Sequence, residues 1–436
     1  SSSTAIEPAI NTNINTKSSP KAINVPSAEL IRFLKKFIIG KCENQIYRFP
    51  NSFPHFCCMA TVYISTGSNM GGRFDYLQSG LHDVSERIGE IVLISSVVET
   101  PALGFDGSPF LNACFTVETS LLPDQVMEQL LQIEKKHGRE RDASKGYVNR
   151  TLDLDLLFYD DSILNTPFLT LPHPSLEKRR FVVQPLAEIV PNKKHPALSQ
   201  TVAALLQDCP DNTSIQVFDQ KLIHPRYRKI KEHAFVCVEG IIGCGKTTLA
   251  KVLADTLGYK TLEERFAENP FLPKFYRKPK RFAFPLELSF LADRFKQINE
   301  EAEQLDLFQS GVVADYHMSK SLVFAKNTLN EDEYPLFKQL YELMSRSANQ
   351  PSLCIYLRQT PERAKANIKN RGRSYEQNIA INYLEQLAKG YDQHLPFLKA
   401  QMAVAVVDVS DLDFVLQQQD LYTLLDRINV QLDAIA

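Results

Sequence analysis

Two aspartates stand one residue apart inside an otherwise apolar run, "NRTLDLDLLF", at residues 149–158. If this run is a β-strand, its side chains alternate between the two faces, so that Asp153 and Asp155 point to the same side. Two carboxylates about 6 to 7 Å apart repel each other by roughly 2 to 3 kcal/mol at an effective dielectric constant of about 20. We therefore expect a positive group between them.

Basic side chains suited to polyphosphate flank this strand in the sequence. The planar fork of arginine matches phosphate oxygens, and paired carboxylates hold Mg²⁺ through oxygen ligands. The candidates are Arg139 and Arg141 in "HGRER", Arg150, His173 in "LPHP", Lys178, Arg179 and Arg180. These residues alone leave two interpretations open: a magnesium and polyphosphate site, or an exposed pair of aspartates balanced by surface arginines.

A second motif, "GIIGCGKT" at 240–247, fits the phosphate-binding pattern G-x-x-x-x-G-K-S/T between a buried strand and a helix. In this pattern backbone N–H groups and the helix N-terminus hold phosphates, Lys246 reaches the β- and γ-phosphate oxygens, and Thr247 binds Mg²⁺. The expected ATP-binding residues here are Gly240, Gly243, Gly245, Lys246, Thr247 and Thr248.

The phosphate-binding motif is shared by GTPases, ATP-driven motors and small-molecule kinases. The stretch "GVVAD", which ends at Asp315, resembles a Walker-B strand that all three classes have. The basic stretch "NRGRSYE" at 370–376 lies on a helical pattern after the strand "LCIYLR". This placement favours the arginine-rich lid of a nucleoside or nucleotide kinase.

The elements that position these residues follow two rhythms. Strand patterns at 61–66, 91–100, 110–120 and 151–158 alternate with helical patterns to give β-α-β-β-α-β, which predicts a ferredoxin-like α+β domain. Later strand patterns, separated by long helical ones, predict an α/β P-loop kinase domain with a parallel sheet flanked by helices. These later strands are expected at 235–239, 311–315, 353–357 and 403–408.

A length of 436 residues suggests two or three domains. Residues 1–58, rich in Ser, Asn, Thr, Ala and Pro, are expected to be a poorly ordered leader, with a transit peptide as the alternative. The first domain is expected at 59–218 and the P-loop domain at 234–436. Between them, 219–233 ("DQKLIHPRYRKIKEH") loses apolar periodicity and is interpreted as a solvated linker.

The net charge of −2 gives no global field that would recruit nucleic acid or an anionic membrane. The basic run "KFYRKPKR" is therefore interpreted as phosphate-steering or solvated rather than as a nucleic-acid patch. No apolar run reaches the roughly 18 residues of a membrane span. The eight cysteines show no C-x-x-C spacing, which argues against zinc and disulfides and favours the reducing cytoplasm.

Six ordered motifs over residues 60–218 resemble the folate-pathway family of 6-hydroxymethyl-7,8-dihydropterin pyrophosphokinases. They are "GSNMGGR", "ETPALG", "FLNACFTVET", "IEKKHGRER", "NRTLDLDLLFYD" and "LPHPSLEKRRFVVQPLAEI". The resemblance implies that Asp153 and Asp155 bind two Mg²⁺ ions that bridge the ATP phosphates. The reaction it implies transfers a pyrophosphoryl group from ATP to the pterin hydroxymethyl oxygen.

The same resemblance assigns roles to further residues of the first domain. Arg139, Arg150 and His173 would grip ATP phosphates, with Glu134 beside the arginines at the ATP site, while Arg141 and Arg179 approach the transferred group. The pterin would be bound by Thr100, Pro101, Leu103, Phe110, Asn112 and Phe181. One inserted residue between Arg141 and Arg150, a segment that carries Tyr147, departs from the bacterial pattern and affects how this catalytic loop closes.

Residues 234–400 resemble the deoxynucleoside kinase family, nearest to its bacterial deoxyguanosine kinases. The resemblance rests on "LEERFAENPFLPKFYRKPKRFAFPLELSFLADRFKQ" and "VVADYHMSKSLVFA". It implies that Glu264 is the base for the 5′-hydroxyl, that Arg371 and Arg373 are lid arginines, and that Asp315 is catalytic. Tyr276 and Glu376 would hold the 3′-hydroxyl, and Glu287 and Arg294 would lie in the base pocket.

Two positions depart from the kinase family's pattern. Asp315, Tyr316 and His317 stand where many members have an acidic-Arg-Ser triplet, so the arginine's role must move or be absent. Glu287 replaces a common glutamine. A carboxylate accepts from both donors of guanine, N1–H and the 2-amino group, while Arg294 or Lys320 could serve O6, which predicts deoxyguanosine over deoxyadenosine and deoxycytidine. The alternative is a salt bridge from Glu287 to Arg294 that only shapes the pocket.

The sequence thus predicts a bifunctional enzyme that uses ATP, with two Mg²⁺ in the pyrophosphokinase site and one in the kinase site. The expected partners are small molecules, namely dihydropterin, deoxynucleoside and ATP, with neither nucleic acid nor membrane, and a homodimer through the kinase domain. The alternatives are a pterin-sensing regulatory module at the N-terminal side, a kinase that prefers deoxyadenosine or is broad, and a P-loop motor. The metal pair argues against the sensor, and the nucleoside-pocket residues argue against the motor.

Overall fold

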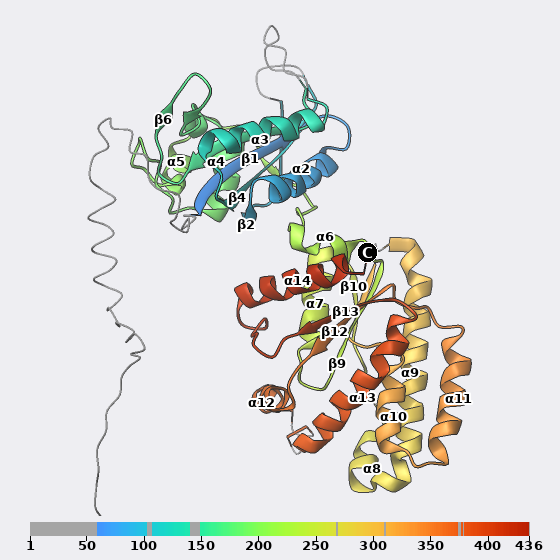
Figure 1. The fold of residues 1–436 in the computed structure, drawn as a ribbon. Helices are drawn as coiled ribbons and strands as arrows, with labels where there is room; N and C mark the ends of the chain where they lie inside the picture. The colour runs from blue at the N-terminus through green and yellow to red at the C-terminus, as the bar shows by residue number, and fades with distance from the viewer. Residues whose placement is uncertain are drawn as a thin grey trace, which may run out of the picture. The chain divides into compact units, whose positions relative to one another are not determined.

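The computed structural model describes residues 59–102, 107–139, 149–266, 269–308, 311–373, 376–377 and 379–435, without the side chains of Tyr276 and 301–308. The leader expected at 1–58 lies outside these residues. Two sheets with separate hydrophobic cores organise the rest (Figure 1).

The N-terminal sheet is antiparallel, in the order β5-β1-β4-β3-β8, with β2 also paired to β4. The expected strand at 91–100 is divided into two because Ser95 Oγ accepts from the backbone N–H of Cys114 while Ser96 bonds the Glu188 carboxylate, which interrupts the ladder. The strands are β1 (Ala60–Ser68), β2 (Glu90–Ile94), β3 (Val98–Thr100), β4 (Phe110–Thr119), β5 (Asp153–Tyr159) and β8 (Gln216–Val217), beside a separate hairpin of β6 (Leu164–Asn165) and β7 (Thr170–Leu171).

Helices cover both faces of this sheet because its strands alternate apolar side chains to each side. Val62 and Ile64 of β1 belong to the core beneath α2 and α3, whereas Tyr63 belongs to the core beneath α4 and α5. The helices are α2 (Arg73–Arg87), α3 (Pro123–Lys136), α4 (Arg180–Ile189) and α5 (Val202–Asp208), with a 3₁₀ turn η1 (Leu176–Lys178) before α4.

The C-terminal sheet is parallel, in the order β10-β11-β9-β12-β13. The four expected strands are present, and the short edge strand β10 is an addition, since three residues are too few to show a period. Its strands are β9 (Phe235–Gly240), β10 (Lys260–Leu262), β11 (Val312–Ala314), β12 (Leu353–Arg358) and β13 (Ala403–Asp408).

Long helices flank this parallel sheet. α7 packs on β9, β10 and β11, α14 packs on β13, and α9, α10, α11 and α13 form a group of neighbouring helices (Figure 1). The helices are α7 (Lys246–Leu257), α8 (Leu272–Arg277), α9 (Pro279–Phe308), α10 (Lys320–Thr328), α11 (Glu333–Ser345), α12 (Pro361–Arg371), α13 (Ile381–Lys399) and α14 (Gln418–Asp433).

The segment 219–233 is more ordered than a solvated connector. It contains η2 (Pro225–Tyr227) and α6 (Arg228–Lys231). Leu222 joins the core of the antiparallel sheet, while Tyr227 and Ile230 are buried in the core of the parallel sheet. The few apolar residues of this segment are therefore all used as anchors, although their spacing gives no regular period.

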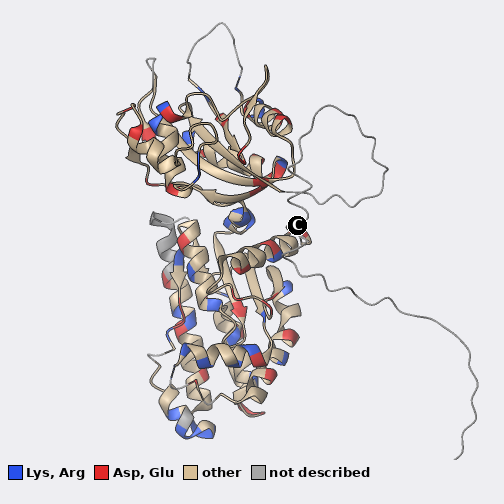
Figure 2. Ribbon diagram, turned by 90° about the vertical axis from the view of Figure 1, so that its left-hand side faces the viewer, with Lys and Arg blue, Asp and Glu red and all other residues tan. Residues whose placement is uncertain are grey.

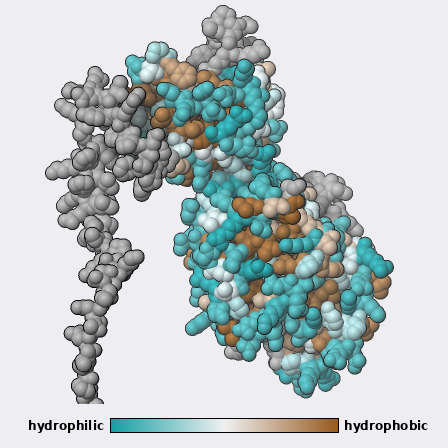
Figure 3. Space-filling view, viewed as in Figure 1, coloured by the Kyte–Doolittle hydropathy of each residue, from teal (hydrophilic) through white to brown (hydrophobic). Residues whose placement is uncertain are grey.

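The surface is polar and mixed in charge. Basic and acidic residues alternate over the helices (Figure 2), and on the face seen in Figure 3 hydrophobic residues lie in small groups among hydrophilic ones. Within the described parts of the chain, no helix has the length and apolar character needed to cross a membrane.

Candidate functional sites

The first candidate site lies on the face of the antiparallel sheet that α4 covers. Gly67 of β1 pairs with Asn112 of β4 on one side and with Asp153 of β5 on the other. Residues opposite each other in a ladder share a face, so the expected pterin ligand Asn112 and the expected metal ligand Asp153 point the same way. A β-carbon at Gly67 would come within 2.9 Å of Asn112 Oδ1. The glycine therefore keeps the space between Asn112 and Asp153 open.

The pterin-pocket residues extend this face. Thr100 pairs with Phe110 across β3 and β4, and the amide of Asn112 donates to the Thr100 hydroxyl at 2.9 Å. Phe181, in the first turn of α4, packs against the core on the same side of the sheet. Pro101 is exposed at the end of β3. Leu103 lies outside the described residues.

Asp153 is held by two arginines. Arg139 contacts one carboxylate oxygen and Arg150 the other, and Arg139 also pairs with Glu134. Glu134 is buried and accepts a hydrogen bond from the backbone N–H of Leu154 at 2.9 Å, which ties α3 to β5. The positive charge expected beside the aspartates is thus present as arginine side chains.

Asp155 faces a second pair of basic groups. Arg179 lies 3.7 Å and His173 4.0 Å from its carboxylate oxygens. Burial, together with the negative charge of Asp153, raises the pKa of Asp155. Burial likewise lowers the pKa of His173, against the opposing effect of Asp155. Both groups are therefore disfavoured in their charged forms. A bound cation would favour the carboxylate of Asp155, and a bound polyphosphate would favour the imidazolium of His173.

The oxygen donors at Asp153 and Asp155 fit magnesium. Mg²⁺ is commonly bound through one or two carboxylates, with substrate phosphates and water as its remaining ligands. Among the described residues no cluster of three or more His, Cys, Asp or Glu could hold a metal. Arg141 and Tyr147, on the segment expected to close over the phosphates, lie outside the described residues.

Asn69 is a site residue that the sequence reasoning missed. Its side chain accepts from the backbone N–H of Arg150 at 2.6 Å and donates to Asn149 Oδ1 at 2.7 Å and to the carbonyl of Ser108 at 3.1 Å. It thereby fixes the backbone of Arg150. The motif "GSNMGGR" contains the signal, because a buried asparagine directly after a strand must satisfy both ends of its amide.

The second candidate site is built on the turn between β9 and α7. Gly240, Gly243 and Gly245 all have positive φ, at 144°, 85° and 96°, where other residues are strained. A β-carbon at Gly243 would lie 2.5 Å from the carbonyl oxygen of Ala364 in α12. Glycine is therefore required both for the turn and for the close approach of the lid helix.

Lys246 and Thr247 begin α7 at the end of this turn. Lys246 Nζ donates to the carbonyls of Gly240 and Ile241 at 2.8 and 3.0 Å. The Thr247 hydroxyl donates to Asp315 Oδ2 at 2.5 Å, so the aspartate that resembles a Walker-B residue meets the P-loop threonine. Together they present oxygens that suit one Mg²⁺. Thr248 follows in the same first turn and is half-buried.

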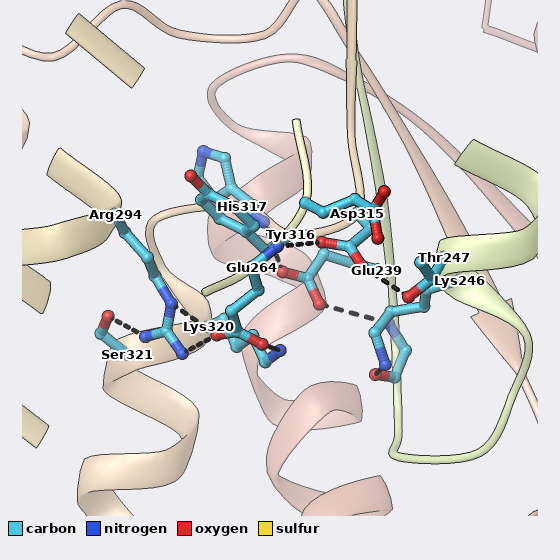
Figure 4. A network of polar contacts seen from close by, with 12 residues as sticks. Glu239, Lys246, Thr247, Glu264, Arg294, Asp315, Tyr316, His317, Lys320 and Ser321 are labelled. Atoms are coloured by element: carbon cyan, nitrogen blue, oxygen red, sulfur yellow. Dashed lines mark hydrogen bonds and ion pairs between the residues drawn. The ribbon is translucent and has the colours of Figure 1, made fainter. Parts of the chain in front are cut away.

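Glu264 lies between two cations (Figure 4). Lys320 Nζ is 2.5 Å from one carboxylate oxygen, and Arg294 contacts the other through Nε at 3.0 Å and through a terminal nitrogen. The Glu264 side chain is 15% exposed, and Lys320 and Arg294 hold its pKa well below the usual range. Its backbone N–H donates to Asp315 at 2.9 Å. Glu264 is therefore ionised and fixed beside Asp315.

Glu239 is a second residue that the sequence reasoning missed. It is buried at the end of β9, where it accepts from the backbone N–H of His317 at 2.6 Å and from the Tyr391 hydroxyl at 2.9 Å. Burial raises its pKa, although the charges of Lys320 and Lys246 oppose this. The carboxyl joins the P-loop to the segment after β11 and to α13. The acidic residue before the first glycine of "EGIIGCGKT" was the available signal.

The expected lid arginines meet at one carboxylate. Arg371 contacts Glu376, Arg373 lies 3.5 Å from the same carboxylate, and the Arg373 guanidinium stacks 4.5 Å from the centre of the Phe266 ring. The contacts of Glu376 in the structure are therefore with the two lid arginines. Its expected bond to the sugar 3′-hydroxyl stays a prediction. The side chain of Tyr276, its expected partner, lies outside the described residues.

Glu287 is buried on α9, seven residues before Arg294. It accepts a hydrogen bond from the Thr328 hydroxyl at 2.9 Å. Among the described contacts it forms no ion pair, because Arg294 and Lys320 are both directed at Glu264. The alternative interpretation, a salt bridge from Glu287 to Arg294, is therefore wrong. Arg294 and Lys320, the two cations considered for guanine O6, both contact Glu264.

Comparisons with known proteins divide the chain at the same place as its two sheets. Residues 63–191 match the family model of 7,8-dihydro-6-hydroxymethylpterin-pyrophosphokinase, and residues 236–433 match that of deoxynucleoside kinase. A pyrophosphokinase of Aquifex aeolicus is 40% identical over 156 residues, 36% of this chain and 94% of the relative.

Two kinases resemble the C-terminal half. The deoxyguanosine kinase of Bacillus subtilis is 35% identical over 189 residues, 43% of this chain and 91% of the relative. A deoxyadenosine kinase of Dictyostelium discoideum is 30% identical over 190 residues, 42% of this chain and 76% of the relative. Both families are enzymes that use ATP, generally with Mg²⁺, the first to transfer a pyrophosphoryl group and the second a phosphoryl group. The chain belongs to both families, joining a dihydropterin pyrophosphokinase of folate biosynthesis to a deoxynucleoside kinase in one polypeptide.

Proposed function

We propose that the kinase half phosphorylates deoxyguanosine in preference to deoxyadenosine and deoxycytidine. The observation that carries this proposal is the buried carboxylate of Glu287, at a position where many relatives have glutamine. Within the described structure it forms no ion pair, because Arg294 and Lys320 both contact Glu264. Guanine offers two adjacent donors, and a carboxylate accepts from both. Leaving a buried partner unpaired costs about 1 to 3 kcal/mol, which is roughly a 5- to 150-fold preference.

The remaining kinase residues have roles consistent with phosphoryl transfer. Lys246 and the glycine turn would hold the ATP phosphates, and Thr247 with Asp315 would hold one Mg²⁺. Glu264 would accept the hydrogen bond of the 5′-hydroxyl and orient it toward the γ-phosphate. Arg371 and Arg373 would neutralise the charge of the transferring group, and their shared contact with Glu376 keeps the two guanidinium groups close together.

For the pyrophosphokinase half we propose transfer to 6-hydroxymethyl-7,8-dihydropterin with two Mg²⁺ ions. Asp153 and Asp155 would hold these ions, which would neutralise the charge on the bridging phosphates. Arg139, Arg150, His173 and Arg179, already arranged around the aspartates, would bind the phosphate oxygens. Phe110, Asn112 and Phe181 would position the pterin on the same face of the sheet.

The sheet order supports a ferredoxin-like domain in this half. In that fold the fourth strand borders the first, which borders the third; β5, β1 and β4 follow this pattern, with β2 and β3 on the far side of β4. We place the domain at 59–218, the linker at 219–233 and the kinase domain at 234–436. The anchors Tyr227 and Ile230 belong to the linker by sequence and to the kinase core by packing.

We also propose that the chain forms a homodimer through its kinase half. Leu336 and Leu343 lie seven residues apart on α11, hence on one helix face, and are 50% and 63% exposed. Replacing Leu343 by Glu should shift the molar mass measured by light scattering from dimer to monomer. A monomeric wild-type protein would contradict the proposal.

The base preference is tested by measuring kcat/KM for deoxyguanosine, deoxyadenosine and deoxycytidine with the wild type and with Glu287→Gln. The wild type should favour deoxyguanosine, and the amide should move the preference toward the other two nucleosides. A wild type that favours deoxyadenosine, or an unchanged ranking in the variant, would show that Glu287 does not read guanine.

A further inference from the structure

We propose that the proton on Glu287 selects the base: the ionised carboxylate takes guanine, the protonated carboxyl takes adenine or cytosine, and the substrate preference of the kinase therefore follows pH. This inference rests on the proposed placement of Glu287 in the base pocket. It goes beyond a fixed preference for one nucleoside, because the same side chain recognises guanine in one protonation state and adenine or cytosine in the other.

Glu287 is enclosed without a counter-ion in the described structure. It is 3% exposed, on α9, and the two cations that could have neutralised it are both bound to Glu264. Arg294 uses Nε and one terminal nitrogen on Glu264 and the other terminal nitrogen on Ser321. A buried carboxylate that lacks a close cation is disfavoured in its charged form.

The charges around Glu287 come from three elements. They are Arg294 on its own helix, Lys320 at the start of α10, and Glu264 after β10. Burial raises the pKa of Glu287 to about 7, outweighing Arg294 and the Thr328 hydrogen bond, which lower it. The neighbouring helix α11 contributes Phe337 and Tyr341 to the core. Burial raises the pKa of Tyr341, so its phenol is neutral near pH 7. The cations of α8, Lys274 and Arg277, are exposed.

Thr328 can satisfy either form of Glu287. Its hydroxyl lies 2.9 Å from Glu287 Oε1 and 3.1 Å from the carbonyl oxygen of Phe324, and it has one hydrogen for these two acceptors. When Glu287 is ionised, the hydroxyl donates to the carboxylate. When Glu287 is protonated on its other oxygen, Oε2, the hydroxyl still donates to Oε1, and the O–H of the carboxyl remains available to a base. Neither state leaves the half-buried threonine unpaired.

Each form of the carboxyl matches a different pairing edge. The carboxylate has acceptors only and suits N1–H and the 2-amino group of guanine. The carboxyl has one donor and one acceptor, like the amide of glutamine, and suits N1 and the 6-amino group of adenine or N3 and the 4-amino group of cytosine. Protonation thus gives Glu287 the hydrogen-bonding pattern of the glutamine that it replaces.

Two consequences can be measured. Where both forms are populated, the ratio of kcat/KM for deoxyguanosine to that for deoxyadenosine should rise about tenfold per pH unit, because one proton separates the two complexes. Ionisations shared by the two reactions, including those of ATP, cancel in the ratio. Below the pKa of Glu287, deoxyguanosine binding should release a proton to the buffer; above it, deoxyadenosine binding should take one up.

The experiment measures this ratio with the full chain, ATP and Mg²⁺ from about pH 6 to about pH 8, a range in which neither base titrates. The ratio should rise with pH in the wild type and stay level in Glu287→Gln, whose amide cannot ionise. Thr328→Val removes the donor that stabilises the carboxylate and should move the rise to higher pH. Calorimetry of deoxyguanosine binding in two buffers of different ionisation heat gives the proton count independently of turnover.

The outcomes separate this inference from the proposed function. A level ratio in the wild type, or an equal slope in Glu287→Gln, would overturn the proton-dependent selection, even if deoxyguanosine is preferred throughout. A sloping ratio with deoxyadenosine preferred at every pH would support the selection by the proton and overturn the preference for deoxyguanosine.

Discussion

The ammonium group of Lys320 lies 2.5 Å from a carboxylate oxygen of Glu264, the residue expected to orient the nucleoside's 5′-hydroxyl. The family resemblance calls for an arginine in the acidic-Arg-Ser triplet, and Tyr316 occupies that place, buried and bonded to Gln297 at 2.8 Å. Lys320, from the first turn of α10, supplies a cation beside Glu264 instead. We therefore expect Lys320 to take over the role of the missing arginine.

Replacing Lys320 by Met should lower kcat/KM for nucleoside phosphorylation about 10²-fold, since a misplaced base or acceptor costs this much. Pterin pyrophosphorylation should be unchanged. Lys320→Arg should restore part of the kinase activity, which a purely structural role would not predict. Lys326→Met, on the same helix but exposed, is the matched control. Wild-type kinase activity in Lys320→Met would exclude this role.

Asp153→Ala or Asp155→Ala should abolish pterin pyrophosphorylation, because each removes a proposed magnesium ligand, and should leave nucleoside phosphorylation nearly intact. Both rates are measured on the same preparation with ATP and Mg²⁺. Asp161→Ala is the control, since Asp161 follows the same strand and its side chain is 85% exposed. Loss of both activities in a folded variant would contradict two independent sites.

Lys246→Ala should remove nucleoside phosphorylation alone, because the first site has no P-loop lysine and binds ATP through arginines and a histidine. Lys251→Ala, on the exposed side of α7 and paired with Glu263 at 3.0 Å, should keep both activities. Turnover of each substrate is followed by separating the products. Kinase activity near that of the wild type would remove Lys246 from the mechanism.

His394 on α13 should make the protein less stable in acid. Burial lowers its pKa to about 4, and its Nε2 is buried without a partner among the described residues. Because the unfolded chain binds the proton first, at an ordinary pKa of about 6.5, the free energy of unfolding falls by about 1.4 kcal/mol per pH unit between these values.

His394→Gln should lose less stability over this range, so the urea midpoint of the wild type should fall relative to that of the variant as the pH is lowered from about 6.5 to about 4. The other histidines are present in both proteins and cancel in the comparison. Parallel curves for the two proteins would show that His394 is protonated as easily in the folded state as in the unfolded one.

Local patterns predicted much of the architecture and less of the contacts. Alternation in "NRTLDLDLLF" placed Asp153 and Asp155 on one face, and the P-loop pattern identified the turn before Lys246, because both depend on short-range geometry. The buried anchors of the linker were missed, since Tyr227 and Ile230 are held by distant parts of the fold. Lys320 was expected at the base and contacts Glu264 instead, a pairing that depends on how α10 meets the segment after β10.

The position of Gly67 between Asn112 and Asp153 also fixes a length. Neighbouring strands in a sheet are spaced about 4.8 Å apart, so the backbones at Asn112 on β4 and Asp153 on β5, with β1 between them, lie about 10 Å apart. Main-chain hydrogen bonds set this interval, and it does not vary with side-chain rotamers. If the proposed assignments hold, acceptor and donor are aligned by the rigidity of three adjacent strands, and a change in strand register would disable the enzyme without altering any ligand.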